Sequence, residues 1–173
     1  MAAGGDFEDA VAYTIEAMLQ SPRFIYRIEK KRGNGSLSPV SYAELASRLS
    51  YTLWGAPPDQ ELFSVAEKGE LTNPAKIEAQ AKRMLKDPRA IDQSVRFLTE
   101  WLNLGRLDHI QPNANHFPDW HPALAADMRH ETIAFFKEIV WKQKRPLTDL
   151  LNAPVTFVTP RLAQHYRLPL APE

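Results

Sequence analysis

Three of the five histidines lie in one short, proline-containing stretch of the sequence: His109, His116 and His121, with Asp108 and Asp119 beside them. Neutral imidazole suits zinc and copper, and carboxylates can complete such a ligand set. No fixed spacing relates the three histidines, and loop histidines also cap helices or hydrogen-bond at the surface. The sequence therefore offers His109, His116 and His121 as metal-ligand candidates, while we favour structural or surface roles for them.

A second candidate for metal chemistry combines Asp127, His130 and Glu131. Their spacings of three and four residues place these side chains on neighbouring turns of one helix. Acid-x-x-His units contribute to di-metal sites in helical bundles, but such a site needs two units and two further carboxylates. The sequence has no second acid-x-x-His unit. We therefore interpret these acids as the solvated flank of a helix.

Other classes of chemistry have no motif in this sequence. The chain contains no cysteine, which excludes disulfides, thiolate metal sites and covalent c-type haem attachment within these residues. No G-x-S-x-G elbow, P-loop or G-x-G-x-x-G is present. We expect neither a catalytic residue nor a bound cofactor in this segment alone.

The tryptophans offer candidates for recognition. Trp101 follows Phe97 at helical spacing, which predicts that both rings pack in the core. Trp120 follows Phe117 in an irregular stretch, and its sequence context is compatible with packing or with surface recognition. We therefore take Trp120 and Phe117 as interaction candidates.

The elements that must position these residues are helices, and prolines mark where they begin. Proline at the first helical position loses no hydrogen bond and has its φ preset. Five of the 14 prolines follow a residue that can cap a helix: Pro22, Pro74, Pro88, Pro122 and Pro160. Ser41 and Glu44 form an S-x-x-E capping box at a further helix start.

Apolar periodicity then predicts helices over about 7–20, 41–54, 74–86, 88–104 and 122–144, with shorter ones elsewhere. No strand pattern accompanies them. The expected fold is all-α, a compact array of about six to eight helices without a substantial β-sheet.

The charge balance argues against nucleic acid as a partner. Lysine plus arginine equals aspartate plus glutamate, 21 each, so the formal net charge is zero. The one dense basic run, Lys30–Arg32, is interpreted as a solvated loop. No apolar run approaches the ~20 residues needed to span a bilayer, so we expect no transmembrane segment.

Several ordered motifs resemble a domain of unknown function that occurs in large planctomycete-type proteins. The motifs lie at 42–54, 58–62, 83–89, 97–102, 149–151, 156–158 and 161–166. Residues 17–27 are similar to the tail of the domain that usually precedes this family. One position departs from the family pattern: after His165 and Tyr166, where members usually have glycine, this chain has Arg167.

The resemblance implies a context rather than a reaction. Family members are modules of exported proteins that also carry c-type cytochrome domains, so it implies an extracytoplasmic location and haem c in a neighbouring domain. It carries over no catalytic residue. The length of 173 residues indicates a single helical domain over residues 6–173. The resemblance implies that the tail of the preceding module, residues 6–40, packs on residues 41–173. Residues 1–5 are interpreted as an added start or a cut from a larger protein.

Three hypotheses about function follow. The leading one is a non-catalytic helical scaffold or interaction module that positions neighbouring domains of the same polypeptide. The second is that His109, His116 or His121 supplies a metal or axial haem ligand to an oxidoreductase site shared with a neighbour. The third is polysaccharide binding through Trp120 and nearby aromatic residues.

Overall fold

The computed structural model describes residues 6–26 and 40–169, and most of these residues are helical, with irregular segments at 109–121 and 152–159. The α-helices of this described part are α1 (Phe7–Leu19), α2 (Pro22–Ile25), α3 (Tyr42–Trp54), α4 (Gln60–Glu67), α5 (Pro74–Met84), α6 (Pro88–Trp101), α7 (Pro122–Phe136) and α8 (Pro160–His165). Shorter 3₁₀ or π segments are η1 (Glu70–Thr72), η2 (Leu104–Asp108), η3 (Lys137–Lys142) and η4 (Leu147–Leu151). The described ranges contain no strand, and the predicted all-α fold class is confirmed.

Side-chain caps define the helix starts. The predicted capping box is confirmed: the backbone N–H of Glu44 donates to Ser41 Oγ at 3.2 Å, and the N–H of Ser41 donates to Glu44 Oε2 at 2.6 Å. All five prolines that were predicted to begin helices do so, at α2, α5, α6, α7 and α8. Local sequence therefore suffices to predict these helix starts.

A first core lies where α3 packs against α4, α5 and α6. Leu62 and Met84 have no exposed surface there, and Trp54 is only 5% exposed. Burying a leucine or methionine side chain contributes about 1.5–3 kcal/mol. The buried residues of this first core are Ala46, Trp54, Leu62, Ala66, Leu71, Met84 and Ala90.

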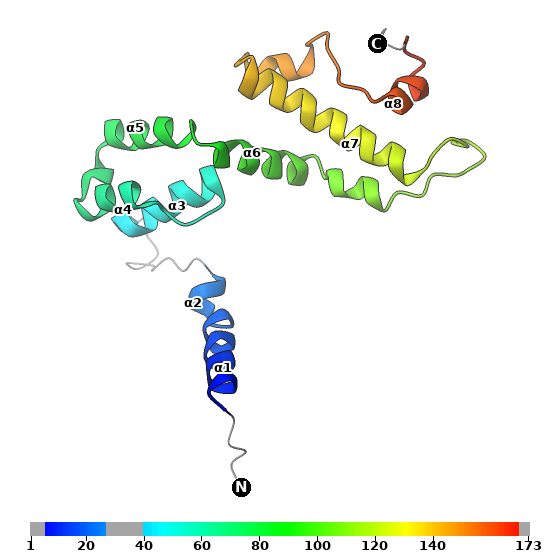
Figure 1. Cartoon of the computed structure of the whole chain (residues 1–173). Helices are drawn as coiled ribbons and strands as arrows, with labels where there is room; N and C mark the ends of the chain where they lie inside the picture. Colours follow the sequence, from blue (N-terminus) through cyan, green and yellow to red (C-terminus); the bar gives the residue numbers. More distant parts are fainter. Residues whose placement is uncertain (1–5, 27–39, 170–173) are drawn as a thin grey trace, which may run out of the picture.

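A second group of buried side chains lies on the later elements. α7 packs against η2, α6 and α8, and η3 packs against η4 and α6. Figure 1 shows α6 running from the α3–α5 group toward the side of α7. Buried apolar side chains in this second group are Leu98, Leu104, Leu124, Ala125, Ile139, Leu162 and Ala163. α6 thus contributes to both groups and connects them.

The prediction of one regular helix from Pro122 to Lys144 is wrong in its last part. α7 ends at Phe136 and continues as the π-helix η3, with the N–H of Gln143 donating to the carbonyl of Glu138. A π turn holds one more residue than an α turn, which shifts the side chains that follow around the axis. Trp141 in η3 donates its indole N–H to Ser94 Oγ at 2.9 Å and so ties η3 to α6.

The first two helices have an open apolar face. Neither α1 nor α2 contains a buried residue, and Phe7 is 83% exposed. Figure 1 draws them apart from α3–α8. The segment after Ser21 forms the short helix α2. The packing of residues 6–40 on residues 41–173 stays a prediction; residues 1–5 and the basic run Lys30–Arg32 lie outside the described ranges.

Within residues 6–26 and 40–169, no helix combines the length and the apolar character that crossing a bilayer requires.

Candidate functional site

A polar cavity of about 440 Å³ lies where the start of α7 meets α8. Its volume falls in the range of roughly 300–1,000 Å³ that is usual for small-molecule pockets. Side chains from the segment before α7, from the first turn of α7 and from α8 and its C-terminal turn line it. They are Asp119, His121, Leu124, Arg161, Gln164, His165 and Arg167.

His121 enters this cavity because it caps α7. Its Nδ1 accepts the backbone N–H of Leu124 at 3.3 Å, and Pro122 occupies the first helical position. The neutral ring then carries its proton on Nε2, because Nδ1 acts as an acceptor. Leu124 is 1% exposed and anchors the first turn of α7 in the core.

The side chain of Arg161 is held in place by the carboxylate of Asp127. Its Nε donates to Asp127 Oδ2 at 2.6 Å, and the Asp127 residue is only 8% exposed. The pKa of the Asp127 carboxyl is lowered, first by this hydrogen bond from Arg161 and also by one from Thr159. Thr159 caps α8 as well, since its Oγ1 accepts the N–H of Leu162.

Arg167 reaches the cavity from a left-handed turn that ends α8. Its φ is +56°, and the N–H of Leu168 donates to the carbonyl of Ala163 at 2.8 Å. This is the geometry in which helices usually end at glycine, because a Cβ is disfavoured in the left-handed region. The conformation also gives a physical reason for the glycine that the family pattern led us to expect at this position.

The predicted histidine candidates separate in the structure. All three residues are exposed, and of the three His121 lines the cavity whereas His109 and His116 do not. Within the described ranges no three or more histidine, aspartate or glutamate side chains are grouped so that they could hold a metal ion. The hypothesis of a haem or metal ligand shared with a neighbouring domain stays a prediction.

The acids of the second candidate make structural bonds. Glu131 Oε2 accepts the hydroxyl of Tyr166 at 2.9 Å, and Glu131 Oε1 accepts the hydroxyl of Thr156. Asp127 is buried beneath Arg161. The interpretation of these acids as a solvated flank is therefore wrong for Asp127 and incomplete for Glu131: both tie the C-terminal segment to α7.

The aromatic pair on α6 also corrects a prediction. Phe97 and Trp101 were expected in the core, but they are 61% and 68% exposed. Their rings stack with centroids 6.0 Å apart and planes 18° apart. Helical spacing predicted that the two rings meet, but it did not predict which part of α6 the other helices cover: Ala90 and Leu98 are buried, whereas this pair is not.

The two interaction candidates near α7 differ in exposure. Phe117 is 56% exposed, and Trp120 is half-buried. The backbone N–H of Trp120 donates to the carbonyl of Phe117, so both residues belong to one turn. Neither is among the residues that line the cavity.

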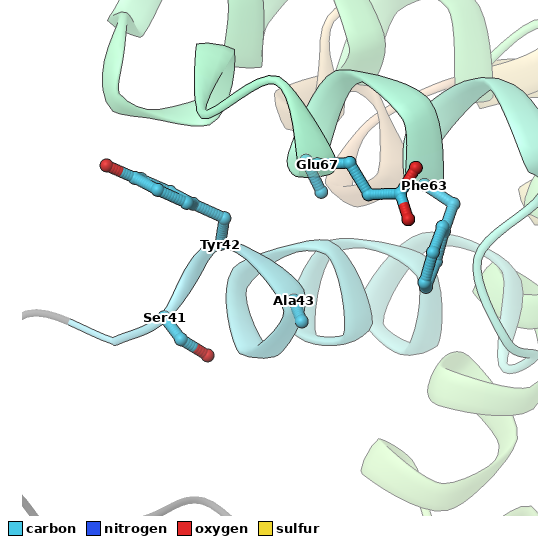
Figure 2. A pocket seen from close by; sticks show the side chains of 6 residues that line it. Ser41, Tyr42, Ala43, Phe63 and Glu67 are labelled. Atoms are coloured by element: carbon cyan, nitrogen blue, oxygen red, sulfur yellow. The ribbon is translucent and has the colours of Figure 1, made fainter.

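A second, apolar hollow of about 270 Å³ lies between the start of α3 and α4. Figure 2 shows Tyr42 from α3 on one side of it, with Phe63 and Glu67 from α4 on the other. Tyr42 is 45% exposed and Phe63 is 44% exposed. Glu67 is the one carboxylate among its lining residues.

Sequence reasoning missed the three cationic or ionisable residues that α8 and the turn after it bring to the cavity. Arg161, His165 and Arg167 are about 40 residues from His121 along the chain, and no local motif links them to it. The capping threonine and proline at 159–160 do predict α8 itself.

Comparisons with known proteins give a family but no activity. No curated protein and no solved protein structure matches this chain. The family model for PSD4, described as a protein of unknown function (DUF1592), matches residues 40–168, from just before α3 to just after α8. This match covers about three quarters of the sequence, and the chain therefore belongs to the PSD4 family of proteins of unknown function (DUF1592).

Proposed function

We propose that this domain is a non-catalytic helical interaction module that binds a neighbouring domain of its own polypeptide through Phe97 and Trp101. The observation that carries the proposal is the exposure of this stacked pair on α6. Large aromatic side chains are enriched at the energetic centres of protein interfaces.

The surroundings of the pair suit an interface. Arg96 and Glu100, both exposed, lie on the same helix and give the aromatic surface a polar border. α6 itself is fixed by two buried residues, Ala90 two turns before Phe97 and Leu98 next to it. A rigid aromatic anchor costs little side-chain entropy when it binds, which favours a defined docking geometry.

The family resemblance supplies the context of the proposal. It supports a multidomain, extracytoplasmic protein in which the partner domain carries haem c. In this proposal haem stays in the partner domain, and the present module positions that domain.

Calorimetric titration of the 173-residue chain with the haem-bearing segment of its parent protein tests the proposal. The double variant Phe97→Ala/Trp101→Ala is expected to weaken binding at least ~30-fold, the equivalent of the ~2 kcal/mol that defines an interface hot spot. Leu151→Ala is the matched control, because Leu151 is 91% exposed on η4 and is not part of the pair.

Equal binding by wild type and double variant would overturn the role of the pair. Turnover of a substrate by the isolated chain would overturn the non-catalytic assignment.

A further inference from the structure

We propose that the cavity between the start of α7 and α8 binds the carboxylate group of a small, hydroxylated molecule. This inference is independent of the interaction surface on α6. It rests on the cavity, on the side chains that line it and on the backbone conformation of Arg167.

Arg161 is oriented by the carboxylate of Asp127, which also offsets part of its charge. The bond to Asp127 uses the Nε–H of Arg161. A guanidinium carries four further N–H donors, on Nη1 and Nη2, in a planar fork that matches a carboxylate. Asp127 thus restrains the guanidinium through Nε, while Arg161 lines the cavity.

Arg167 supplies a second cation at an unfavourable backbone position. Its φ of +56° ends α8 in the left-handed region, where glycine is the residue with the lowest cost. Residues held in sparsely populated backbone regions cluster at active sites and ligand-binding sites. Arg167 lines the cavity, so we infer that its guanidinium is retained there for the ligand.

The remaining lining groups narrow the class of ligand. Asp119 also lines the cavity, and its negative charge opposes a doubly charged phosphate more than a singly charged carboxylate. Asp119 and Gln164 can accept hydrogen bonds from hydroxyl groups, and His121 and His165 add ring nitrogens. A monocarboxylate with several hydroxyl groups, such as a sugar acid, can pair its carboxylate with the arginines and form hydrogen bonds to the other lining side chains through its hydroxyl groups.

The probe is sodium D-glucuronate, titrated into the 173-residue chain at constant ionic strength and followed by calorimetry and by NMR shifts of the His121 and His165 rings. D-Glucose tests the hydroxyl groups without charge, acetate tests the charge without hydroxyl groups, and inorganic phosphate tests a competing anion. Glucuronate is expected to bind at least tenfold more tightly than each of the three.

Arg167→Gly is the decisive variant because folding and binding should change in opposite directions. The glycine relieves the left-handed backbone and is expected to raise the thermal unfolding midpoint, while glucuronate binding falls at least tenfold. Lys144→Gly is the matched control, since Lys144 has a φ of +52° and does not line this cavity. It should raise the midpoint and leave binding unchanged.

Three outcomes would overturn the proposal. They are absence of glucuronate binding, unchanged binding by the stabilised Arg167→Gly variant, and tighter binding of phosphate than of glucuronate.

Discussion

The guanidinium of Arg89 lies over the indole ring of Trp54, with its central carbon 3.6 Å from the ring centroid. The edge of the same ring is bound too, since the indole N–H donates to the carbonyl of Met84 at 2.9 Å. Arg89 is held in turn by Asp87, through bonds of 2.9 Å and 2.7 Å. Trp54 therefore joins the end of α3 to the end of α5 and the start of α6.

Replacing Trp54 by phenylalanine is expected to lower the free energy of unfolding by about 1–3 kcal/mol. The variant loses the buried bond to Met84, worth about 1 kcal/mol, and leaves unfilled volume beside it. Urea denaturation measures the change. Trp101→Ala is the control, because an exposed ring should alter stability by no more than about 0.5 kcal/mol. Equal losses in the two variants would contradict the assigned core.

Gly55→Ala is expected to destabilise the domain by about 1–2 kcal/mol. Gly55 ends α3 at φ +64°, and an added Cβ would meet Gln93 Oε1 below contact distance and Arg96 Nη1 at 3.2 Å. Gly105→Ala is the matched control, because its Cβ would meet nothing within 4 Å. Chemical denaturation of both variants should show a loss in Gly55→Ala alone; a neutral result there would contradict the left-handed assignment.

The sequence predicted helix starts well and burial poorly, for a physical reason. A cap such as Ser41 with Glu44 acts within one turn, so local residues suffice to specify it. The exposure of Phe97 and Trp101 depends on which side of α6 other helices cover, and spacing along α6 carries no information about that. The π segment that begins at Lys137 likewise depends on bonds that apolar periodicity does not encode.

Only some of the residues that line the cavity between α7 and α8 could be predicted from the sequence. His121 could be found because it stands directly before a proline that begins a helix. Arg161 pairs with Asp127 across 34 residues, which requires knowledge of how α8 lies on α7. The unusual conformation of Arg167 was signalled only indirectly, by the family pattern that has glycine at this position.

Lowering the pH is expected to destabilise the fold, because Asp59 and Asp87 then become protonated and lose their ion pairs with arginine. Hydrogen bonding by Arg83 lowers the pKa of Asp59, and that by Arg89 lowers the pKa of Asp87 from 3.8 to about 2. A carboxyl whose pKa is lowered by folding stabilises the native state above its unfolded pKa and loses this contribution as pH falls through the folded value. Thermal midpoints should therefore be constant above about pH 5 and fall between about pH 4 and pH 2.

The variant Asp59→Asn isolates one of these groups. It retains an oxygen that can accept the cap bond from the N–H of Leu62, but it loses the charge paired with Arg83. Its midpoint should lie below that of wild type at pH 7 and approach it near pH 2. If the thermal midpoints of wild type and Asp59→Asn differ by the same amount at every pH from 7 to 2, the pKa of Asp59 does not change on folding.

Tyr166 is expected to resist ionisation because folding keeps its hydroxyl neutral. Burial, together with the hydrogen bond to Glu131, raises the pKa of Tyr166 from 10.0 to about 12. A tyrosine whose pKa is raised by folding contributes stability below its unfolded value and loses that contribution as pH rises toward the folded one. The difference between the phenolate absorbance of wild type and Tyr166→Phe should therefore show a transition near pH 12. A transition near pH 10 would mean that the bond from Tyr166 to Glu131, which ties the end of α8 to α7, does not persist in solution.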